Sequence, residues 1–156
     1  SNHAARPELR ARRAPGSHLI GRFSVMSLVR LLPASLHAVA DYAVGALLIV
    51  VALAVGGSAG AVGTGIVVGA TVLVVSMFTK YPLGVVKVLP FTVHSAGDYL
   101  AAALLLVAPW ALHFSSGDSG LTAFYVAAGV AVLAVSLITN YQYSPKRAWA
   151  AEPQTA

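Results

Sequence analysis

The sequence PASLHAVADYAVGALLIVVALAV at residues 33–55 decides the fold, because it is long and apolar and carries a single charged residue, Asp41. An α-helix needs about 20 mostly apolar residues to cross the hydrocarbon core of a bilayer. Three further stretches meet this requirement, at residues 61–79, 90–112 and 121–139. The sequence therefore predicts an all-α, polytopic membrane protein with four transmembrane helices.

The composition of the whole chain agrees with this prediction. Hydrophobic residues make up 58% of the 156 residues and charged residues only 10%, and the mean hydropathy is +0.78. A soluble domain has roughly 25% charged residues, which it needs to cover its surface. The chain contains no cysteine, which excludes disulfides, thiolate metal ligands and cysteine nucleophiles.

The basic residues predict how the chain is oriented. All ten lysines and arginines lie before the first predicted span, between the second and third, or after the fourth. Because positive residues are retained on the cytoplasmic side, we expect both termini to be cytoplasmic in a multi-pass protein of the bacterial inner membrane. The net charge of +5 is then a topology signal. Membrane lipid is the expected partner, and nucleic acid is not.

The chain contains an internal duplication. The stretch VRLLPASLHAVADY at residues 29–42 aligns without gaps with VKVLPFTVHSAGDY at residues 86–99. The second and fourth predicted spans also share residues, at an offset of 60 positions. These pairs include Gly69 and Gly129, Ser76 and Ser136, Thr79 and Thr139, and Tyr81 and Tyr141.

The duplication divides the chain into four parts. A basic N-terminal arm covers residues 1–28, two helical-hairpin repeats cover residues 29–85 and 86–143, and a C-terminal tail covers residues 144–156. Each repeat holds an even number of spans, so both repeats insert in the same sense. We therefore expect two tandem parallel hairpins related by a pseudo-twofold axis along the membrane normal.

The repeated unit, with a basic residue, a proline and H-x-x-x-D-Y, resembles the bacterial SPW-repeat family of small membrane proteins. The resemblance covers residues 29–143. At the signature tripeptide the second repeat has Ala108-Pro109-Trp110 in place of Ser-Pro-Trp, and the first has Ala52-Leu53-Ala54. The resemblance implies a small bundle of duplicated hairpins and carries no biochemical activity with it.

The repeated polar residues form the candidate site. A charged side chain inside a membrane helix costs roughly 2.5–3.5 kcal/mol on insertion scales. Asp41 and Asp98 are therefore expected to have compensating interactions or a functional role. His37 and His94 each precede one of these residues by four positions and share its helix face. A carboxylate at that spacing can orient an imidazole and fix its tautomer, as the second shell of a metal site does.

Aromatic and basic residues flank this candidate site in both repeats. Tyr42 and Tyr99 follow the two aspartates and are expected to form its walls. Arg30 and Lys87 precede the two helices and are expected to form a cytoplasmic basic rim that attracts anions.

Several functions are compatible with this pattern. His37 and His94 could ligate a divalent metal ion or be the axial ligands of a haem. The His-Asp pairs could also bind a small ligand or act in proton-linked transport. Alternatively, the polar cluster only locks two homologous helices together. The sequence contains no catalytic signature, so no enzyme activity is expected. It favours the structural role, in a self-associating bundle or an accessory subunit of a larger membrane complex, over a specific ligand site.

Small residues predict close helix packing. Ala61, Gly65 and Gly69 recur every four residues in the second span, and Ala123, Ala127 and Ala131 do so in the fourth. Such ridges allow helices to approach closely, either within the bundle or against another protein. Pro109 is expected to kink or end the third span.

Overall fold

The structure is a computed structural model that describes residues 31–141. This part of the chain forms four helices: α1 (Ala34–Val55), α2 (Ala59–Phe78), α3 (Phe91–Ala111) and α4 (Ser119–Ile138). Each helix is long and apolar enough to cross a membrane, so the chain is a multi-pass membrane protein. The expectations for the arm 1–28, for Arg30 and for the tail 144–156 lie outside the described residues.

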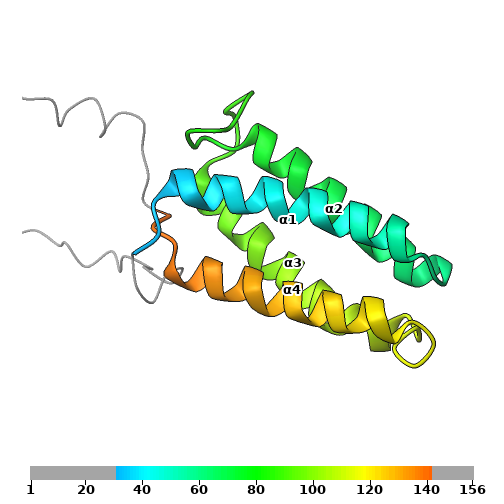
Figure 1. Ribbon diagram of the computed structural model, residues 1–156. Coiled ribbons are helices and arrows are strands. Elements are labelled where there is room, and N and C mark those ends of the chain that lie inside the picture. The colour runs from blue at the N-terminus through cyan, green and yellow to red at the C-terminus, as the bar shows by residue number, and fades with distance from the viewer. Residues whose placement is uncertain (1–30, 142–156) are drawn as a thin grey trace, which may run out of the picture.

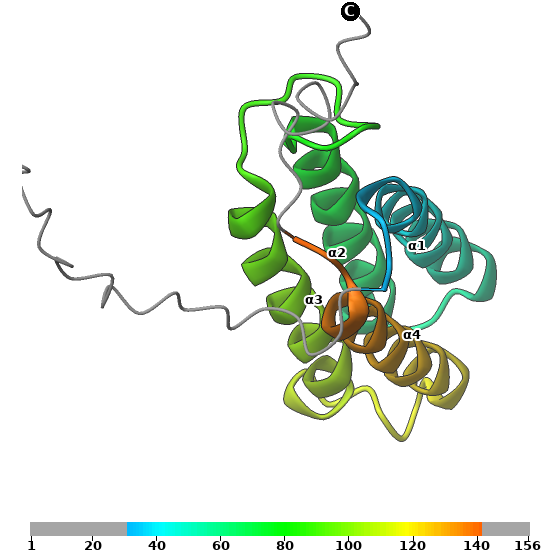
Figure 2. The same cartoon turned by 90° about the vertical axis from the view of Figure 1, so that its left-hand side faces the viewer.

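The four helices form one bundle of two antiparallel hairpins (Figure 1). The short loops after α1 and after α3 lie at one end, and the α2–α3 loop lies at the other end together with Leu31 and Tyr141. We call the end with the α2–α3 loop, Leu31 and Tyr141 the loop end. Figure 2 views the bundle from the loop end and shows the four helices arranged around its axis. Packing is most extensive within the α1/α2 and α3/α4 hairpins.

The helix ends follow local sequence. Pro33 and Pro90 lie just before α1 and α3, where a missing backbone N–H has no cost. The side chain of Ser58 accepts a hydrogen bond from Ala61 N at 3.3 Å and caps α2. Pro109 lies inside α3 without ending it, and the helix runs on to Ala111.

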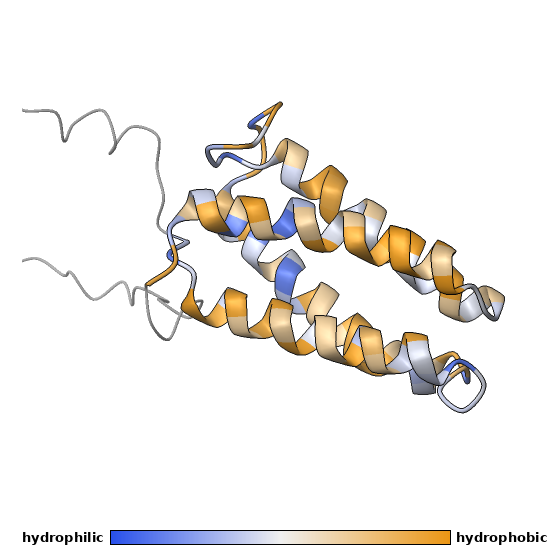
Figure 3. Ribbon diagram, in the orientation of Figure 1, coloured by the Kyte–Doolittle hydropathy of each residue, from blue (hydrophilic) through white to orange (hydrophobic). Residues whose placement is uncertain are grey.

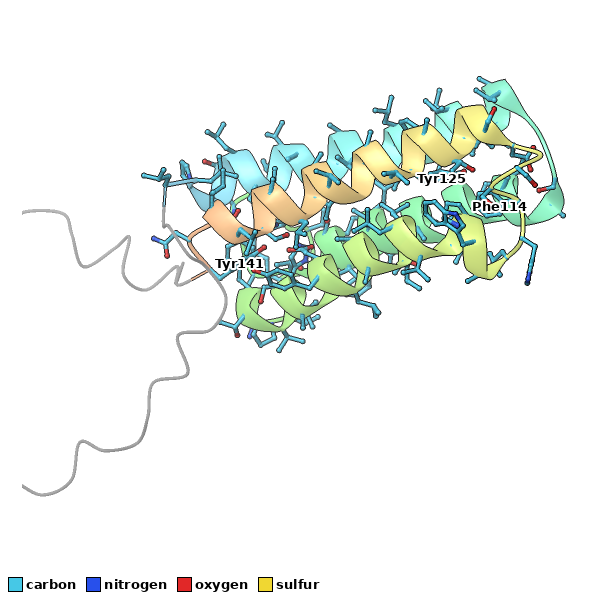
Figure 4. The ribbon with its side chains drawn as sticks, turned by 90° about the horizontal axis from the view of Figure 1, so that it is seen from below. Phe114, Tyr125 and Tyr141 are labelled. Carbon is cyan, nitrogen blue, oxygen red and sulfur yellow. The ribbon has the colours of Figure 1, made fainter. Side chains whose placement is uncertain are left out.

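The helices are apolar along most of their length (Figure 3). Hydrophilic segments interrupt α1 and α3 in the half of the bundle nearer the loop end (Figure 3). In the other half a purely hydrophobic core includes Leu48, Leu105, Leu121, Phe114 and Tyr125. Figure 4 shows Phe114 and Tyr125 in that half and Tyr141 at the loop end.

The small residues of α2 lie within the bundle, where α2 closely approaches α1. A Cβ at Gly65 would lie 2.5 Å from the Ala52 Cβ and 2.7 Å from the Leu48 carbonyl oxygen. A Cβ at Gly69 would lie 2.6 Å from the Gly45 carbonyl oxygen. The alanine ridge of α4 is different, because Ala123, Ala127 and Ala131 are exposed on the outside of the bundle.

At the loop end, two short backbone contacts join the hairpins. Thr79 pairs with Leu89 and Thr139 pairs with Leu32, each as an isolated parallel bridge. The contacts bring the end of α2 beside the start of α3, and the end of α4 beside the start of α1. Thr79 and Thr139 are thereby held next to the helices that carry the candidate histidines.

Candidate metal centre

Four buried polar side chains meet between α1 and α3. His37 and Asp41 lie one turn apart on α1, and His94 and Asp98 occupy the matching positions on α3. The exposed fraction is 1% for His37, 2% for His94, 8% for Asp41 and 7% for Asp98. One ligand atom from each of the four residues lies within 4.8 Å of the others, which is a geometry that could hold a metal ion.

Each carboxylate bridges the two imidazoles. Asp41 places Oδ1 at 3.4 Å from His37 Nε2 and Oδ2 at 3.1 Å from His94 Nε2. Asp98 places Oδ2 at 3.2 Å from His37 Nε2 and Oδ1 at 3.1 Å from His94 Nε2. The two Nε2 atoms and the two carboxylates therefore form one closed cluster that joins α1 to α3.

Two threonines determine which imidazole nitrogen carries the proton. Thr79 Oγ1 donates to the Val75 carbonyl oxygen at 2.7 Å, so its single hydrogen is already used. The same oxygen lies 2.8 Å from His94 Nδ1 and must accept a hydrogen bond from it. Thr139 Oγ1 donates to Val135 O in the same way and lies 2.9 Å from His37 Nδ1. We therefore assign a proton to Nδ1 of both histidines.

The Nε2 atoms point into the cluster without an aligned partner. The distances of 3.1–3.4 Å to the carboxylate oxygens suit ion pairs. Even so, neither Nε2 atom has a hydrogen-bond partner of acceptable angle among the described residues. The angle is the more informative criterion here, because a hydrogen bond weakens steeply as the donor direction turns away from the acceptor. A nitrogen directed between two oxygen atoms suits a cation bound among them, and it equally suits an Nε2–H shared between the two oxygens.

Hydroxyl groups at the ends of α2 and α4 hold the carboxylates in place. Tyr81 OH donates to Asp41 Oδ2 at 3.2 Å, and Ser76 Oγ donates to the same atom at 3.4 Å. Tyr141 OH donates to Asp98 Oδ2 at 2.8 Å. Burial, and with it the charge of the neighbouring carboxylate, raises the pKa of both tyrosines, so the phenols remain protonated donors.

An aromatic layer closes the cluster toward the loop end. The Phe91 ring lies 5.4 Å from the His37 ring and 4.8 Å from the Tyr141 ring, measured between centroids. It also lies 5.5 Å from the Tyr81 ring. Phe91 is 3% exposed, so this layer separates the cluster from the loop end of the bundle. Ala34 occupies the matching position of α1, which leaves space for the single Phe91 ring.

The charge of the cluster limits what it can hold. Two carboxylates and two neutral imidazoles carry a net charge of −2 in a buried site, and uncompensated charge there is very unfavourable. One divalent cation, or one additional proton on each imidazole, restores neutrality. In the second alternative each Nε2–H is shared between two carboxylate oxygens.

The Nε2–oxygen distances are close to the spacing of ligand atoms around a small divalent ion, but each imidazole faces a different oxygen of each carboxylate, and one ligand atom from each residue lies within 4.8 Å of the others. Neighbouring ligand atoms around Zn²⁺, at about 2.0–2.1 Å from the metal, lie about 3.3 Å apart. The four Nε2–oxygen separations are 3.1–3.4 Å. A haem does not fit between the imidazoles, because its macrocycle would need the space that both carboxylates fill.

The structure places the other candidate residues away from this centre. Tyr42 OH donates to the Leu83 carbonyl oxygen at 3.1 Å, outside the cluster. Tyr99 is half-buried on α3 and Lys87 is exposed in the α2–α3 loop. The phenols that contact the aspartates come from Tyr81 and Tyr141.

Five residues that hold the four central side chains were not predicted as site residues: Ser76, Thr79, Tyr81, Thr139 and Tyr141. Their signal is present in the duplication, because the serine, the threonine and the tyrosine recur together in both repeats. Their contact with α1 and α3 depends on the two bridges at the loop end, which a helical pattern does not predict.

Fold and site together define a class of protein: a four-helix membrane protein with a buried cluster of two histidines and two aspartates. No protein-family model matches the chain, and neither the curated proteins nor the solved structures include a significant match. The resemblance to SPW-repeat proteins therefore stays a prediction.

Proposed function

We propose that this protein binds one divalent transition-metal ion inside the membrane through His37, Asp41, His94 and Asp98. The observation that carries the proposal is the convergence of four buried ligand atoms, one from each of these residues, within 4.8 Å of one another. Protonation of Nδ1 leaves an Nε2 lone pair free to coordinate. The threonines and tyrosines behind the four residues then act as the second shell that orients the ligands.

The ligand set favours certain metals. Two imidazole nitrogens and two carboxylate oxygens suit Zn²⁺ and also Mn²⁺, Fe²⁺ or Co²⁺. Mg²⁺ and Ca²⁺ prefer sites built only from oxygen. A divalent ion also neutralises the net charge of −2 that two ionised aspartates bring into the bundle.

A structural or interaction role is the competing proposal. With a proton on both Nδ1 and Nε2 of each histidine, the same four residues would form a neutral network of ion pairs that joins α1 to α3. Such a protein would serve as a rigid bundle, associating with itself or acting as an accessory subunit, and would bind no metal.

Metal content distinguishes the two proposals. The full chain, purified in mild detergent and stripped with a chelator, is dialysed against Zn²⁺ and its metal content is measured by mass spectrometry. We expect one ion per chain, and loss of the ion in the double variant His37→Gln with His94→Gln. The matched control is His113→Gln, which changes an exposed histidine at the far end of α3. Failure of wild type to retain zinc, or retention by the double variant, would overturn the metal proposal in favour of the ion-pair network.

We further propose that the two hairpins are parallel repeats, with both termini on the cytoplasmic side of a bacterial inner membrane. Equivalent backbone bonds support the repeat. Lys80 N donates to Leu89 O at 2.8 Å, and Asn140 N donates to Leu32 O at 3.1 Å. Lys80 and Lys87 support the orientation, because both lie in the loop at the same end as Leu31 and Tyr141, the first and last described residues.

The absence of cysteine in the chain makes the orientation easy to test. A single cysteine is introduced by Lys87→Cys or by Ser116→Cys, at opposite ends of the bundle. An impermeant thiol reagent added to intact cells should label only the Ser116→Cys protein. Labelling of the Lys87→Cys protein alone would reverse the orientation.

A further inference from the structure

A groove beside the cluster opens on the outer surface of the bundle, between α2 and α3. It has a volume of about 270 Å³, and His94 and Asp98 form its polar floor. Aliphatic side chains form its walls, among them Val67, Val72 and Leu100. Val67 is 65% exposed and Leu100 is 61% exposed, so the groove opens toward the lipid.

The matching surface between α1 and α4 is nearly closed. The hollow there has a volume of about 50 Å³, although it also reaches the cluster, at His37, Asp41 and Asp98. The difference follows from two positions of the duplicated helix. Gly97 and Ala101 line the α2/α3 groove, and the residues 57 positions earlier are the larger Ala40 and Val44. The second repeat therefore has room beside its aspartate that the first repeat lacks.

The groove continues along α3 away from the loop end. A second hollow of about 350 Å³ shares Val67, Val68 and Leu104 with the first and extends to Leu112. At a rise of about 1.5 Å per residue, the distance from Asp98 to Leu112 is about 21 Å. The two hollows lie end to end as one long apolar groove on the bundle surface, with a polar end at the cluster.

We propose that this groove binds a membrane-dissolved molecule with a hydroxyl-bearing head and an unbranched apolar tail, such as a long-chain alcohol or a quinol with an alkyl tail. The head lies at the floor, where its hydroxyl donates to the Asp98 carboxylate. The tail lies along α2 and α3, where it covers the aliphatic walls. Phe91 and the two tyrosines cover the cluster on the loop-end side, and the other hollow that reaches Asp98 has a volume of only about 50 Å³, so the groove is the side with room for such a head.

This inference goes beyond the metal proposal and does not depend on it. The carboxylate of Asp98 accepts a hydrogen bond whether a metal ion or two additional protons balance the charge of the cluster. The groove itself arises from the small side chains of Gly97 and Ala101, which are not ligands in the proposed metal site.

Photolabelling tests the proposal. The probe is dodecanol carrying a diazirine next to the hydroxyl, and its partner probe has a methyl group in place of the hydroxyl. Wild-type protein in lipid nanodiscs is irradiated with each probe, and labelled peptides are mapped by mass spectrometry. We expect the alcohol to label α2 and α3 beside the floor about tenfold more than its partner, the ratio that one hydrogen bond to a charged group provides. Equal labelling by the two probes would mean that the groove holds any acyl chain, and would overturn the proposal.

Two variants test the site. Gly97→Ala combined with Ala101→Val gives α3 the side chains that α1 carries at these positions, so we expect the fold to be retained and the alcohol label to be lost. The control Ala96→Val enlarges an exposed neighbour that lies outside the groove and should keep the label. Retention of the label by the double variant would also overturn the proposal.

Zinc content is measured on the same variants. The double variant should keep the ion while it loses the alcohol, because its metal ligands are unchanged. Alcohol labelling in a protein that binds no zinc would refute the metal proposal alone.

Discussion

Replacement of Thr79 by valine tests the second shell of the centre. Thr79 is fully buried, and its Oγ1 lies 2.8 Å from His94 Nδ1. Valine has nearly the same shape but lacks the oxygen, so a buried N–H loses its acceptor in a place that water does not reach. The penalty for such an unpaired donor is about 1–3 kcal/mol. Loss of second-shell partners lowers metal affinity by about 10–100-fold, which is the same range of free energy.

The assay is a competition titration in which the protein and a chromophoric chelator compete for Zn²⁺. We expect Thr79→Val to bind the ion about 10–100-fold more weakly than wild type, and Thr79→Ser to restore most of the affinity because it keeps the hydroxyl. Thr71→Val is the matched control, since Thr71 also donates to a helix carbonyl, Val67 O, at 2.7 Å but is exposed. Wild-type affinity in Thr79→Val, or an equal loss in Thr71→Val, would refute the assignment of the Nδ1 proton and the role of the threonine.

Three further predictions concern helix packing, a buried phenol and a loop contact. Each is tested by unfolding the protein in sodium dodecyl sulfate and following the loss of helix by circular dichroism. Gly65→Ala should lower the unfolding free energy by about 1–3 kcal/mol, because the new Cβ meets the α1 backbone. A Cβ at Gly63 would have no described atom within 4 Å, so the control Gly63→Ala should be neutral or stabilising by up to about 1 kcal/mol. Equal effects of Gly65→Ala and Gly63→Ala would contradict the close contact of Gly65 with α1. Burial raises the pKa of Tyr141 above its ordinary value of 10.0, so its contribution to stability is full below that pH and is lost as the pH rises above it. Tyr141→Phe should therefore reduce the loss of stability at alkaline pH. An unchanged dependence of stability on pH would refute the contribution of Tyr141. Asp118 accepts a hydrogen bond from Ser58 Oγ at 2.6 Å, which joins the loop after α1 to the loop after α3. Asp118→Asn should therefore lower the unfolding free energy by about 1 kcal/mol. An unchanged unfolding free energy would show that this contact does not stabilise the fold.

The fold was predictable from the sequence because lipid imposes a simple rule on length and polarity. Each predicted span matches an observed helix to within two residues at either end. The small residues of α2 indicated a face for close packing but not its partner, which the structure shows to be α1 at Gly65 and Gly69. The α4 ridge was not predictive in this way, because alanines on a membrane helix are equally compatible with a lipid-facing surface.

The candidate centre was predictable only in part. The i, i+4 spacing places each histidine beside its own aspartate, and the duplication places both pairs at one depth. Spacing within a helix does not say which loop residues approach from outside. Thr139 reaches His37 across 102 residues of sequence, through a bridge of irregular backbone. The roles of Phe91 and Gly97 could not be predicted either. These roles depend on how the two residues differ in size from Ala34 and Ala40 once the helices are packed.

X-ray absorption at the zinc edge of the loaded protein tests the central claim most directly. The account predicts one ion per chain with a first shell of nitrogen and oxygen only, at about 2.0–2.1 Å, and with the outer-shell scattering of two imidazole rings. The His37→Gln, His94→Gln protein should retain no zinc and therefore show no zinc edge. A protein that holds no ion after equilibration with zinc, or a first shell without imidazole scattering, would contradict the account and leave the four residues as an ion-pair network.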